Sequence, residues 1–385
     1  MRKGIWESFD GYANVSEEIK ASRILARKRS FELDVADTYI QRLHPERLTL
    51  QVADIIQRTA TSRTLRLVSR QAVLPPFQAG QYLAVFVEIE GIRTSRPYSI
   101  SSPPNQIGYY DITVKRVENG LVSNFLLDRV HVGDDVAVSG PQGHFFFNPL
   151  VHDNKMVCIA GGSGITPFMS MILEIVERGL PRSLTLLYGN RVADDIIFHE
   201  QLTHIADRFE RIHYIPIIEE ASPDDPGQCG LITADLIKKT VGKLEDTTFF
   251  LCGPQGMYDF CLPQIDQLGV PLRKIRKELY GPPVDICKDT GWPKEIEPDH
   301  VFSVSVKDGP VISAPASVPL LVSLENGGVV PPAICRSGEC SMCRVKVLSG
   351  KVFQPAGIPV RKSDRRYGYV HACVSYPLAD LEILT

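Results

Sequence analysis

The chain has 385 residues, of which 44% are hydrophobic and 23% are charged, and its formal net charge at pH 7 is −3. This length suits two or three domains of roughly 150 residues each. A slightly acidic chain has no electrostatic basis for nucleic acid as its main partner. No apolar run approaches the roughly 20 residues that span a bilayer, and the start of the chain lacks the apolar core of a signal peptide. We therefore expect a cytoplasmic protein without a membrane span.

Residues 1–47 form an N-terminal extension whose role the sequence does not reveal. Ser16 is a plausible N-cap for a helix that reaches Leu33, because acidic residues follow it and basic residues lie near the end. The apolar positions of this segment are few. A solvated or docking helix is therefore favoured over a basic helix on a membrane surface.

Residues 48–150 consist of short β-rich segments separated by Gly and Pro. Strands are expected at 48–55, 64–68, 82–89, 110–116 and 133–138, with one short helix at 121–130. Several short strands at close spacing favour an antiparallel β-barrel.

Residues 151–280 alternate apolar strands with helices. Strands are expected at 156–160, 184–188, 213–218 and 248–251, and helices at 166–177, 197–205, 234–239 and 254–262. This alternation indicates an α/β domain with a parallel, doubly wound sheet.

Residues 281–300 are rich in Pro, Gly and charge and resemble a linker. Residues 301–385 then begin with an alternating strand whose apolar side holds Phe302, Val304 and Val306. A helix is expected from Ser317 to Leu324, with Ser317 as its N-cap and Gly327 just past its end.

Four cysteines dominate this last domain. Cys335, Cys340 and Cys343 follow one another as C-x4-C-x2-C, and Cys373 comes thirty residues later. This is the ligand spacing of plant-type [2Fe–2S] clusters, which require soft thiolate ligands. A structural zinc site usually has two closely spaced cysteine pairs, and disulfides suit secreted chains, so both alternatives are less favoured. Gly338 permits a positive φ inside the loop.

A second motif is Arg96-Pro97-Tyr98-Ser99, followed by Lys115 and by Gly120-Leu121-Val122-Ser123. This set resembles the flavin motif of the ferredoxin–NADP reductase superfamily. The resemblance implies that Arg96 holds the flavin pyrophosphate, Tyr98 packs on the isoalloxazine, and Ser99 hydrogen-bonds near N5. It also implies FAD in preference to FMN, with Lys115, Gly120, Val122 and Ser123 at the flavin. Bidentate Arg and a helix N-terminus both suit phosphate.

The loop Gly161-Gly162-Ser163-Gly164-Ile165-Thr166-Pro167 lies between an expected strand and helix. It lacks the Gly-x-Gly-x-x-Gly spacing but resembles the pyridine-nucleotide loop of the same superfamily. The resemblance implies nucleotide contacts by Gly162, Gly164, Thr166 and Pro167, and by Gly189, Asn190 and Arg191 at the adenosine ribose. Arg191 could pair with a 2′-phosphate or be a surface residue, which leaves NADH and NADPH both open.

Cys252-Gly253-Pro254, with Met257, resembles the Cys-Gly-Pro motif of that superfamily. The resemblance places Cys252 beside the nicotinamide and Gly253, Pro254 and Met257 at the nucleotide. Glu278 and Tyr280 close the domain, and similar proteins place an aromatic residue near the flavin. Ser99, Cys252, Tyr280 and Glu278 are therefore the candidate catalytic residues.

The order of domains is similar to reductase components of multicomponent oxygenases. The resemblance implies hydride transfer from NAD(P)H to flavin N5 and single-electron transfer to the cluster, and then to a partner oxygenase or hydroxylase. The alternatives are a reductase for a non-oxygenase acceptor, such as a hybrid-cluster protein or another anaerobic partner, and a redox sensor without sustained turnover. One departure from many plant-type ferredoxins is Ser341, where Gly is frequent.

Charge is unevenly distributed along the chain. Residues 301–385 hold nine basic and six acidic side chains, although the whole chain is acidic. Arg336 and Arg344 flank the cysteine loop, and a basic run occupies residues 361–366. These residues either dock the domain onto its own acidic flavoprotein half or face an acidic patch on the electron acceptor.

Overall fold

The computed structural model describes residues 17–21, 35–70, 73–222 and 225–385. The chain separates into two compact units, residues 1–45 and 46–385. In the first unit, residues 17–21 are helical and α2 spans Val35–Leu43. The remainder of the helix expected from Ser16 to Leu33 lies outside the described residues. No helix in the described part of the chain is long and apolar enough to cross a bilayer.

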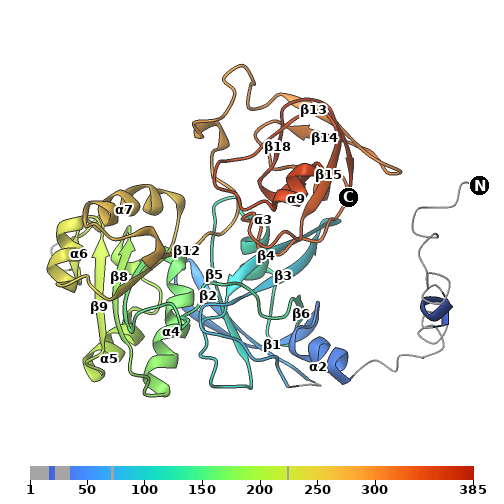
Figure 1. The fold of residues 1–385 in the computed structure, drawn as a ribbon. Helices are drawn as coiled ribbons and strands as arrows, with labels where there is room; N and C mark the ends of the chain where they lie inside the picture. The colour runs from blue at the N-terminus through green and yellow to red at the C-terminus, as the bar shows by residue number, and fades with distance from the viewer. Residues whose placement is uncertain (1–16, 22–34, 71–72, 223–224) are drawn as a thin grey trace, which may run out of the picture. The chain divides into compact units, whose positions relative to one another are not determined.

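The second unit begins with a six-stranded antiparallel sheet in the order β4-β3-β6-β1-β2-β5 (Figure 1). An isolated bridge between Ile100 and Ile112 joins its two edges, so the sheet closes into the expected barrel. Leu83, Val85 and Ile112 fill its centre together with Leu126 from α3. The elements are β1 (Leu48–Thr59), β2 (Ser62–Val68), β3 (Tyr82–Ile89), β4 (Ile92–Ser99), β5 (Tyr110–Lys115), α3 (Leu121–Asp128) and β6 (Asp135–Val138).

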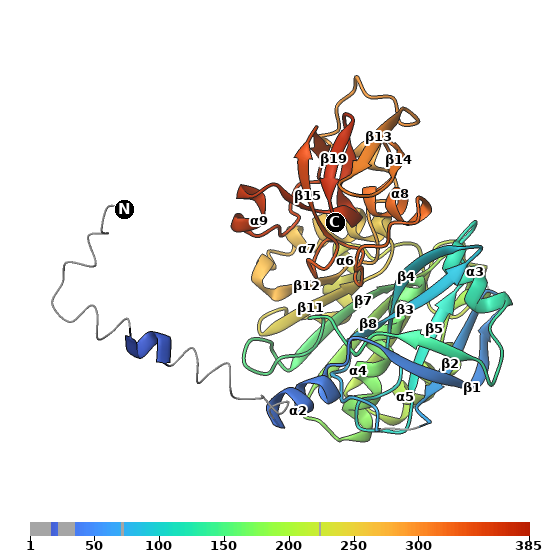
Figure 2. The same cartoon turned by 90° about the vertical axis from the view of Figure 1, so that its right-hand side faces the viewer.

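A six-stranded parallel sheet follows, in the order β10-β9-β8-β7-β11-β12, with helices along its strands (Figure 2). Helices cover both faces of this sheet, because alternate residues of β7 pack on opposite sides. Cys158 packs with α4 and α5, whereas Val157 packs with α6 and α7. The doubly wound arrangement is thus confirmed. The elements are β7 (Lys155–Gly161), α4 (Thr166–Glu177), β8 (Ser183–Asn190), α5 (His199–Arg208), β9 (Ile212–Ile218), β10 (Gln228–Cys229), α6 (Ala234–Val241), β11 (Thr247–Cys252), α7 (Gln255–Gln267) and β12 (Ile275–Glu278).

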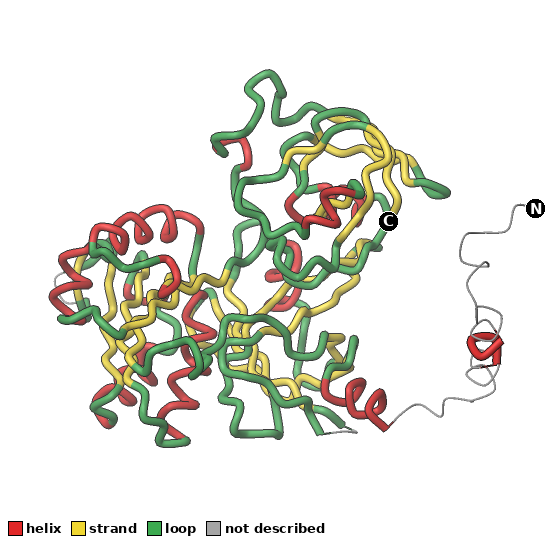
Figure 3. Tube along the Cα trace, in the orientation of Figure 1, coloured by secondary structure: helices red, strands yellow, loops and turns green. Residues whose placement is uncertain are grey.

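The C-terminal part has a five-stranded mixed sheet in the order β14-β13-β19-β15-β17, in which β13 and β19 run parallel. Figure 3 shows strands and short helices together in this part of the chain. With α8 packed on the sheet, this is the expected α+β β-grasp arrangement. The elements are β13 (Val301–Val306), β14 (Val311–Pro315), α8 (Leu320–Asn326), β15 (Arg344–Ser349), β16 (Val352–Phe353), α9 (Lys362–Arg366), β17 (Tyr369–His371), β18 (Tyr376–Pro377) and β19 (Leu381–Leu384).

The prediction that Ser317 caps α8 is wrong. The helix begins at Leu320, and Pro319 occupies the N-cap position without a side-chain hydrogen bond. The physical reason is that a residue before proline is held away from helical ψ, so Val318 cannot enter the first turn. Gly327 follows the last helical residue, as expected.

Residues 281–300 pack on the C-terminal sheet. Ile286 and Trp292 are buried together with Phe302 and Tyr376. The Trp292 ring meets Tyr376 edge-on, with centroids 6.2 Å apart. These contacts anchor the segment to the domain that follows it.

Candidate functional site

A cavity of about 580 Å³ opens beside β4 and α3, and all three domains of the second unit contribute to it. The barrel supplies most of its wall, the nucleotide domain supplies Ser163 and Thr166, and the C-terminal domain supplies Pro319, Val322 and Arg336. Residues predicted at the flavin line it: Arg96, Tyr98, Ser99, Lys115, Gly120, Val122 and Ser123. The structure therefore brings the whole predicted flavin set to one cavity.

Arg96 is half-buried and lines this cavity. Its guanidinium donates to the Thr94 hydroxyl at 2.9 Å and to the Ser95 carbonyl at 2.7 Å. Burial, and then the positive charge of nearby Arg336, lowers the pKa of Arg96 to about 10. A phosphate in the cavity would relieve both effects, so this corner fits the phosphate of a flavin nucleotide.

The N-terminus of α3 lies on the same wall. Gly120 occupies the N-cap position with an extended backbone, and no side chain caps the helix. Val122 and Ser123 of the first turn are buried. Residues of this turn line the same cavity as Arg96, and an uncapped helix N-terminus next to a guanidinium favours anions.

Ser99, Tyr280 and Cys252 form a row beside the cavity. The Ser99 and Tyr280 hydroxyls are hydrogen-bonded to each other, and the Tyr280 hydroxyl also bonds the Cys252 thiol. Burial raises the pKa of Cys252 well above its ordinary value, so the thiol is neutral. Tyr280 thus lies between the strand end that carries the flavin motif and the strand end that carries the Cys-Gly-Pro motif.

Lys115 lines the cavity, but its ammonium pairs with Asp195 of the nucleotide domain at 2.6 Å. The same carboxylate accepts hydrogen bonds from the hydroxyls of Thr59 at 2.8 Å and Thr61 at 2.5 Å. Burial opposes ionisation of Asp195, yet these hydrogen bonds outweigh it and lower its pKa. Asp195 was not identified from the sequence, where it is one acidic residue among many.

The glycine loop runs from β7 through a 3₁₀ turn at Gly162–Ile165 into α4. A Cβ on Gly164 would lie 2.0 Å from the carbonyl oxygen of Cys252. Glycine is therefore required there for the loop to pack against the Cys-Gly-Pro loop. Thr166 opens α4, its hydroxyl donates to the Ser163 carbonyl at 3.0 Å, and Pro167 follows in the first turn, as expected.

The Cys-Gly-Pro segment turns directly from β11 into α7, which starts after Pro254. Met257 of its first turn packs against Gly253 and against Gly161 of the glycine loop. The Tyr258 hydroxyl accepts from the Gly253 N–H at 3.2 Å and donates to the Glu278 carbonyl. These contacts hold both predicted nucleotide loops side by side at the carboxyl ends of β7 and β11, where doubly wound folds bind ligands.

Gly189 and Asn190 end β8, and Arg191 follows them. β8 pairs directly with β7, the strand that leads into the glycine loop. The Asn190 carbonyl accepts from the Glu219 N–H at 3.0 Å. Arg191 is exposed, and its Nε lies 3.5 Å from a carboxylate oxygen of Glu220. Glu220 was not singled out from the sequence, although an acidic residue at this edge can accept a ribose hydroxyl.

The four cysteines come together in the C-terminal domain. The Cys335 side chain lies near those of Cys340 and Cys373, and the Cys343 side chain lies near that of Cys373. The Ser337 and Cys340 N–H groups donate to the Cys335 sulfur at 3.4 and 3.3 Å. In the described residues, no three His, Cys, Asp or Glu side chains are placed to hold one metal ion. The paired sulfurs fit a dinuclear cluster, which takes two ligands on each iron.

The loop has positive φ at three positions between these cysteines, and the first of them is Arg336 with φ +56°. Gly338 has φ +86°, as expected from the sequence, and Ser341 has φ +59°. The value at Ser341 explains why Gly is frequent at this position in similar proteins, since a side chain is disfavoured in the left-handed region. Cys335 packs against Tyr82 and Ala84 of β3, so the loop faces the barrel.

Glu278 ends β12 and is buried, with 4% of its surface exposed. Burial, followed by the nearby charges of Glu339 and Cys335, raises its pKa well above the ordinary value. The Glu278 carboxylate also contributes to the raised pKa of the Cys252 thiol, after burial. Glu278 therefore lies between the predicted nicotinamide position and the cysteine loop.

For Arg336, the structure favours the alternative in which the residue helps to dock the C-terminal domain on the barrel over the alternative in which it faces an acceptor. Arg336 is 4% exposed and forms two 2.7 Å hydrogen bonds with Glu325, which is equally buried. It also donates to the Thr94 hydroxyl of β4 at 3.2 Å. The sequence could not reveal this, because the partners lie 11 and 242 positions away.

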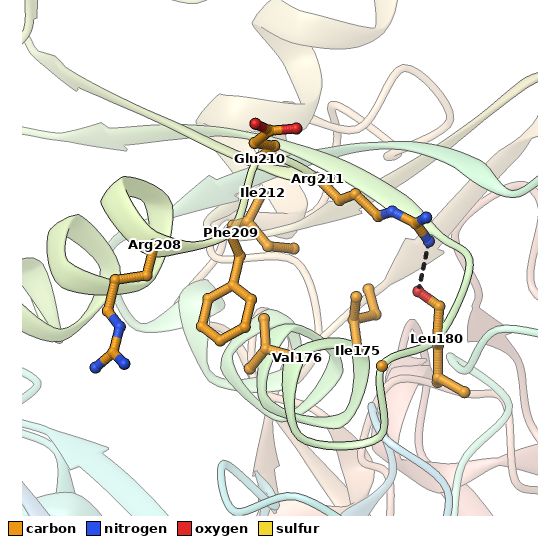
Figure 4. Close-up of a pocket in the computed structure, with 9 residues that line it drawn as sticks. Ile175, Val176, Leu180, Arg208, Phe209, Glu210, Arg211 and Ile212 are labelled. Atoms are coloured by element: carbon orange, nitrogen blue, oxygen red, sulfur yellow. Dashed lines mark hydrogen bonds between the residues drawn. The ribbon is translucent and has the colours of Figure 1, made fainter.

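A second cavity, of about 340 Å³, lies in the nucleotide domain at the ends of α4 and α5 (Figure 4). Ile175, Val176 and Phe209 form its apolar side, and Arg211 bonds the Leu180 carbonyl at its rim. None of the predicted site residues lines it. It adjoins the start of β9, opposite the strand ends where ligands bind in this fold.

Comparison with known families accounts for most of residues 46–385. Residues 47–147 match the oxidoreductase FAD-binding domain, residues 158–262 match the oxidoreductase NAD-binding domain, and residues 307–378 match the 2Fe–2S iron–sulfur cluster binding domain. The chain is an oxidoreductase with FAD-binding, NAD-binding and 2Fe–2S domains. The expected order of domains and the expected cofactor classes are thereby confirmed.

Proteins similar to this oxidoreductase match it along most of its length and of their own. The glycine betaine monooxygenase reductase subunit of Chromohalobacter salexigens is 28% identical, over 88% of this chain and 95% of its own length. The NADH oxidoreductase HCR of Escherichia coli strain K12 is 29% identical, over 86% of this chain and 96% of its own. Among solved structures, phthalate dioxygenase reductase matches with a TM-score of 0.64 and 24% identity, covering 88% of this chain and 97% of that one. The last comparison establishes the shared fold.

Proposed function

We propose that this oxidoreductase passes electrons from NADH or NADPH, through FAD and a [2Fe–2S] cluster, to a partner oxygenase or hydroxylase. One observation carries the proposal: the cysteine loop packs directly on the strands that carry the flavin motif. The Ser95 hydroxyl donates to the Ala333 carbonyl at 2.8 Å, and Cys335 packs on Tyr82. Bound FAD would supply the exchange of a hydride for single electrons, and the cluster would carry them onward.

The roles of individual residues belong to the same proposal. Arg96 and the α3 N-terminus would hold the flavin phosphate, and Ser99 would orient the ring with Tyr280 and Cys252 beside the nicotinamide. Cys335, Cys340, Cys343 and Cys373 would hold the cluster. We also propose domain boundaries at 48–150, 151–280 and 301–385, with 281–300 as the connection. The free state of all nine cysteines supports a reducing, cytoplasmic compartment.

Removal of one cluster ligand tests the direction of electron flow. Cys340→Ser should lose the cluster yet keep flavin reduction by NAD(P)H and the reduction of ferricyanide. Reduction of cytochrome c or of the natural partner should fall sharply, because both depend on the cluster. Loss of ferricyanide activity in a folded variant that still contains flavin would contradict the modular scheme.

The acceptor would dock through an acidic patch. The support is a basic group on α9, which we call the α9 patch: Arg361, Lys362, Arg365 and Arg366, all exposed. Asp364 of the same helix pairs at 3.3 Å with Arg344, the residue directly after Cys343. The α9 patch therefore lies next to the end of the cysteine loop, where an acidic surface would be attracted.

Charge reversal tests the α9 patch. Arg365→Glu with Arg366→Glu should slow electron transfer to the natural acceptor several-fold, and about 0.5 M salt should do the same to the unchanged protein because it shortens the Debye length. Lys307→Glu is the matched control, because it is exposed and adjoins β13 and β14 at the opposite edge of the sheet from β17 and α9. If neither salt nor the double reversal changes the rate of electron transfer to the acceptor, the α9 patch is not the docking site.

A non-oxygenase acceptor is the second candidate, since an NADH oxidoreductase is as similar to the chain as the monooxygenase reductase subunits are. The rates at which candidate acceptors oxidise the reduced cluster distinguish the two. An oxygenase component that oxidises it no faster than an unrelated iron–sulfur protein would favour this second candidate.

Coenzyme choice would depend on Arg191 and Glu220. Arg191→Ala should weaken NADPH roughly 10- to 100-fold, which corresponds to the loss of a charge-assisted hydrogen bond, and leave NADH little changed. Glu220→Gln frees Arg191 and should raise kcat/KM for NADPH. Equal losses for both coenzymes in Arg191→Ala would leave Arg191 without a role in coenzyme choice.

A further inference from the structure

Arg336 belongs to the cysteine loop, yet its side chain forms part of the cavity wall where Arg96 lies. Two further residues of the C-terminal domain, Pro319 and Val322, complete this side of the wall. Arg336 directly follows Cys335, which packs on the barrel. The wall of the flavin cavity is therefore built across two domains.

Three charged groups and one hydroxyl meet at this wall. The Thr94 hydroxyl accepts from Arg96 at 2.9 Å and from Arg336 at 3.2 Å, and it donates to Glu325 at 3.0 Å. Glu325 is engaged by both nitrogens of the Arg336 fork. Glu325 thus pairs directly with Arg336 and reaches Arg96 only through the Thr94 hydroxyl, and this largely buried group carries one excess positive charge.

A buried excess charge is costly unless an anion neutralises it. The lowered pKa of Arg96, to which Arg336 contributes, reports the same imbalance. The cavity in front of the two guanidiniums also receives the N-terminus of α3. Guanidinium groups and free helix N–H groups together are the donor set that favours phosphate.

We propose that Arg336 is a flavin-phosphate residue contributed by the C-terminal domain, so that the flavin site is complete only when that domain is docked. The proposal rests on the proposed function, in which the cavity binds FAD. Because linkage is reciprocal, bound flavin nucleotide also stabilises the docked position of the cluster loop. One arginine would thus couple the occupancy of one redox centre to the placement of the other.

Flavins that differ in their phosphate test this assignment in the full chain with its cluster. FAD, FMN and riboflavin are titrated into the flavin-free protein, and quenching of flavin fluorescence gives each dissociation constant. Arg336→Gln should weaken FAD and FMN roughly 10- to 100-fold, the loss expected for a charge-assisted hydrogen bond. Riboflavin, which has no phosphate, should bind as in the unchanged protein.

Arg344→Gln is the matched control, since Arg344 follows another cysteine of the loop but is exposed and pairs with Asp364. It should leave all three dissociation constants unchanged. Cluster content is measured for each variant from iron and visible absorbance. If Arg336→Gln loses its cluster, Arg336→Lys decides, because it keeps the charge but loses the fork, and the ratio of FAD to riboflavin affinity should still fall.

An unchanged ratio in both Arg336 variants, or equal losses for all three flavins, would overturn the proposal and leave Arg336 as a domain-docking residue. Failure of the unchanged protein to bind any flavin is a different result. It would overturn the proposed function itself and would be visible before any variant is compared.

Discussion

The barrel has two faces that bind neighbouring domains, and they treat charge in opposite ways. Toward the nucleotide domain, Lys115 pairs with Asp195 while their side chains remain 26% and 24% exposed. At the face toward the C-terminal domain, Arg336 and Glu325 of that domain pair with each other, each side chain only 4% exposed, and both bond the Thr94 hydroxyl of the barrel. Water and salt screen the charges of the first pair, whereas protein surrounds the second pair and excludes water from it.

The two ion pairs differ in how readily they break and form again. A partly hydrated ion pair is weak and forms again readily, which suits a face where a nicotinamide must enter beside Tyr280. A buried bidentate pair tolerates no missing partner, which suits a face where two redox centres must keep a fixed separation. Substitutions that alter one face at a time can test this contrast.

Removal of the buried carboxylate should have the largest effect. Glu325→Gln leaves the buried Arg336 and the half-buried Arg96 without a countercharge. Loss of one partner of a buried pair costs about 3–5 kcal/mol. Denaturant unfolding of the C-terminal domain, followed by the visible absorbance of its cluster, measures this loss. A change below about 1 kcal/mol would show that this face is hydrated like the other one.

Removal of Asp195 should cost less. Asp195→Asn breaks the pair with Lys115 and weakens the bonds from Thr59 and Thr61, for which about 1 kcal/mol is expected because the site is partly exposed. Asp128→Asn is the matched control, since its pair with Arg116 lies wholly on the barrel with side chains 50% and 41% exposed. A loss equal to that of Glu325→Gln would contradict the contrast between the faces.

The same pair should make the nucleotide-domain face acid-sensitive. The pKa of Asp195 is lower in the folded chain than in the unfolded one, so its stabilisation is complete above the unfolded value of about 3.9. This contribution is lost as the pH falls through the lower, folded value. The difference in stability between the unchanged protein and Asp195→Asn should therefore disappear in this acid window. Unfolding midpoints measured from pH 6 downward check this, and a constant difference would contradict it.

The smallest effect concerns Ser341, which lies between Cys340 and Cys343 in the cysteine loop. Ser341→Gly relieves a left-handed backbone and should stabilise the cluster loop by about 0.5–1 kcal/mol. Slower loss of the cluster in chelator, measured from its visible absorbance, reports the gain. Faster loss would show that the serine side chain contributes more than the strain costs.

Motifs whose meaning lies in local spacing could be read from the sequence. The cysteine spacing indicated the cluster, and Arg96-Pro97-Tyr98-Ser99 with Gly120-Leu121-Val122-Ser123 indicated a flavin site that the structure gathers into one cavity. Strand and helix alternation indicated the parallel sheet. In each case the residues that act together are close in the chain, or their order alone implies the fold.

The sequence by itself thus determined the three kinds of domain and the classes of cofactor they bind. Only the tertiary structure decided what joins them. Asp195 and Glu325 are ordinary acids in the sequence. Each acquires its role from a distant partner: Lys115, 80 positions from Asp195, and Thr94, 231 positions from Glu325. Contacts at such separations depend on how completed domains pack, and burial then sets their strength. For this reason Arg336, which by sequence alone belongs to the cluster loop, faces the flavin cavity.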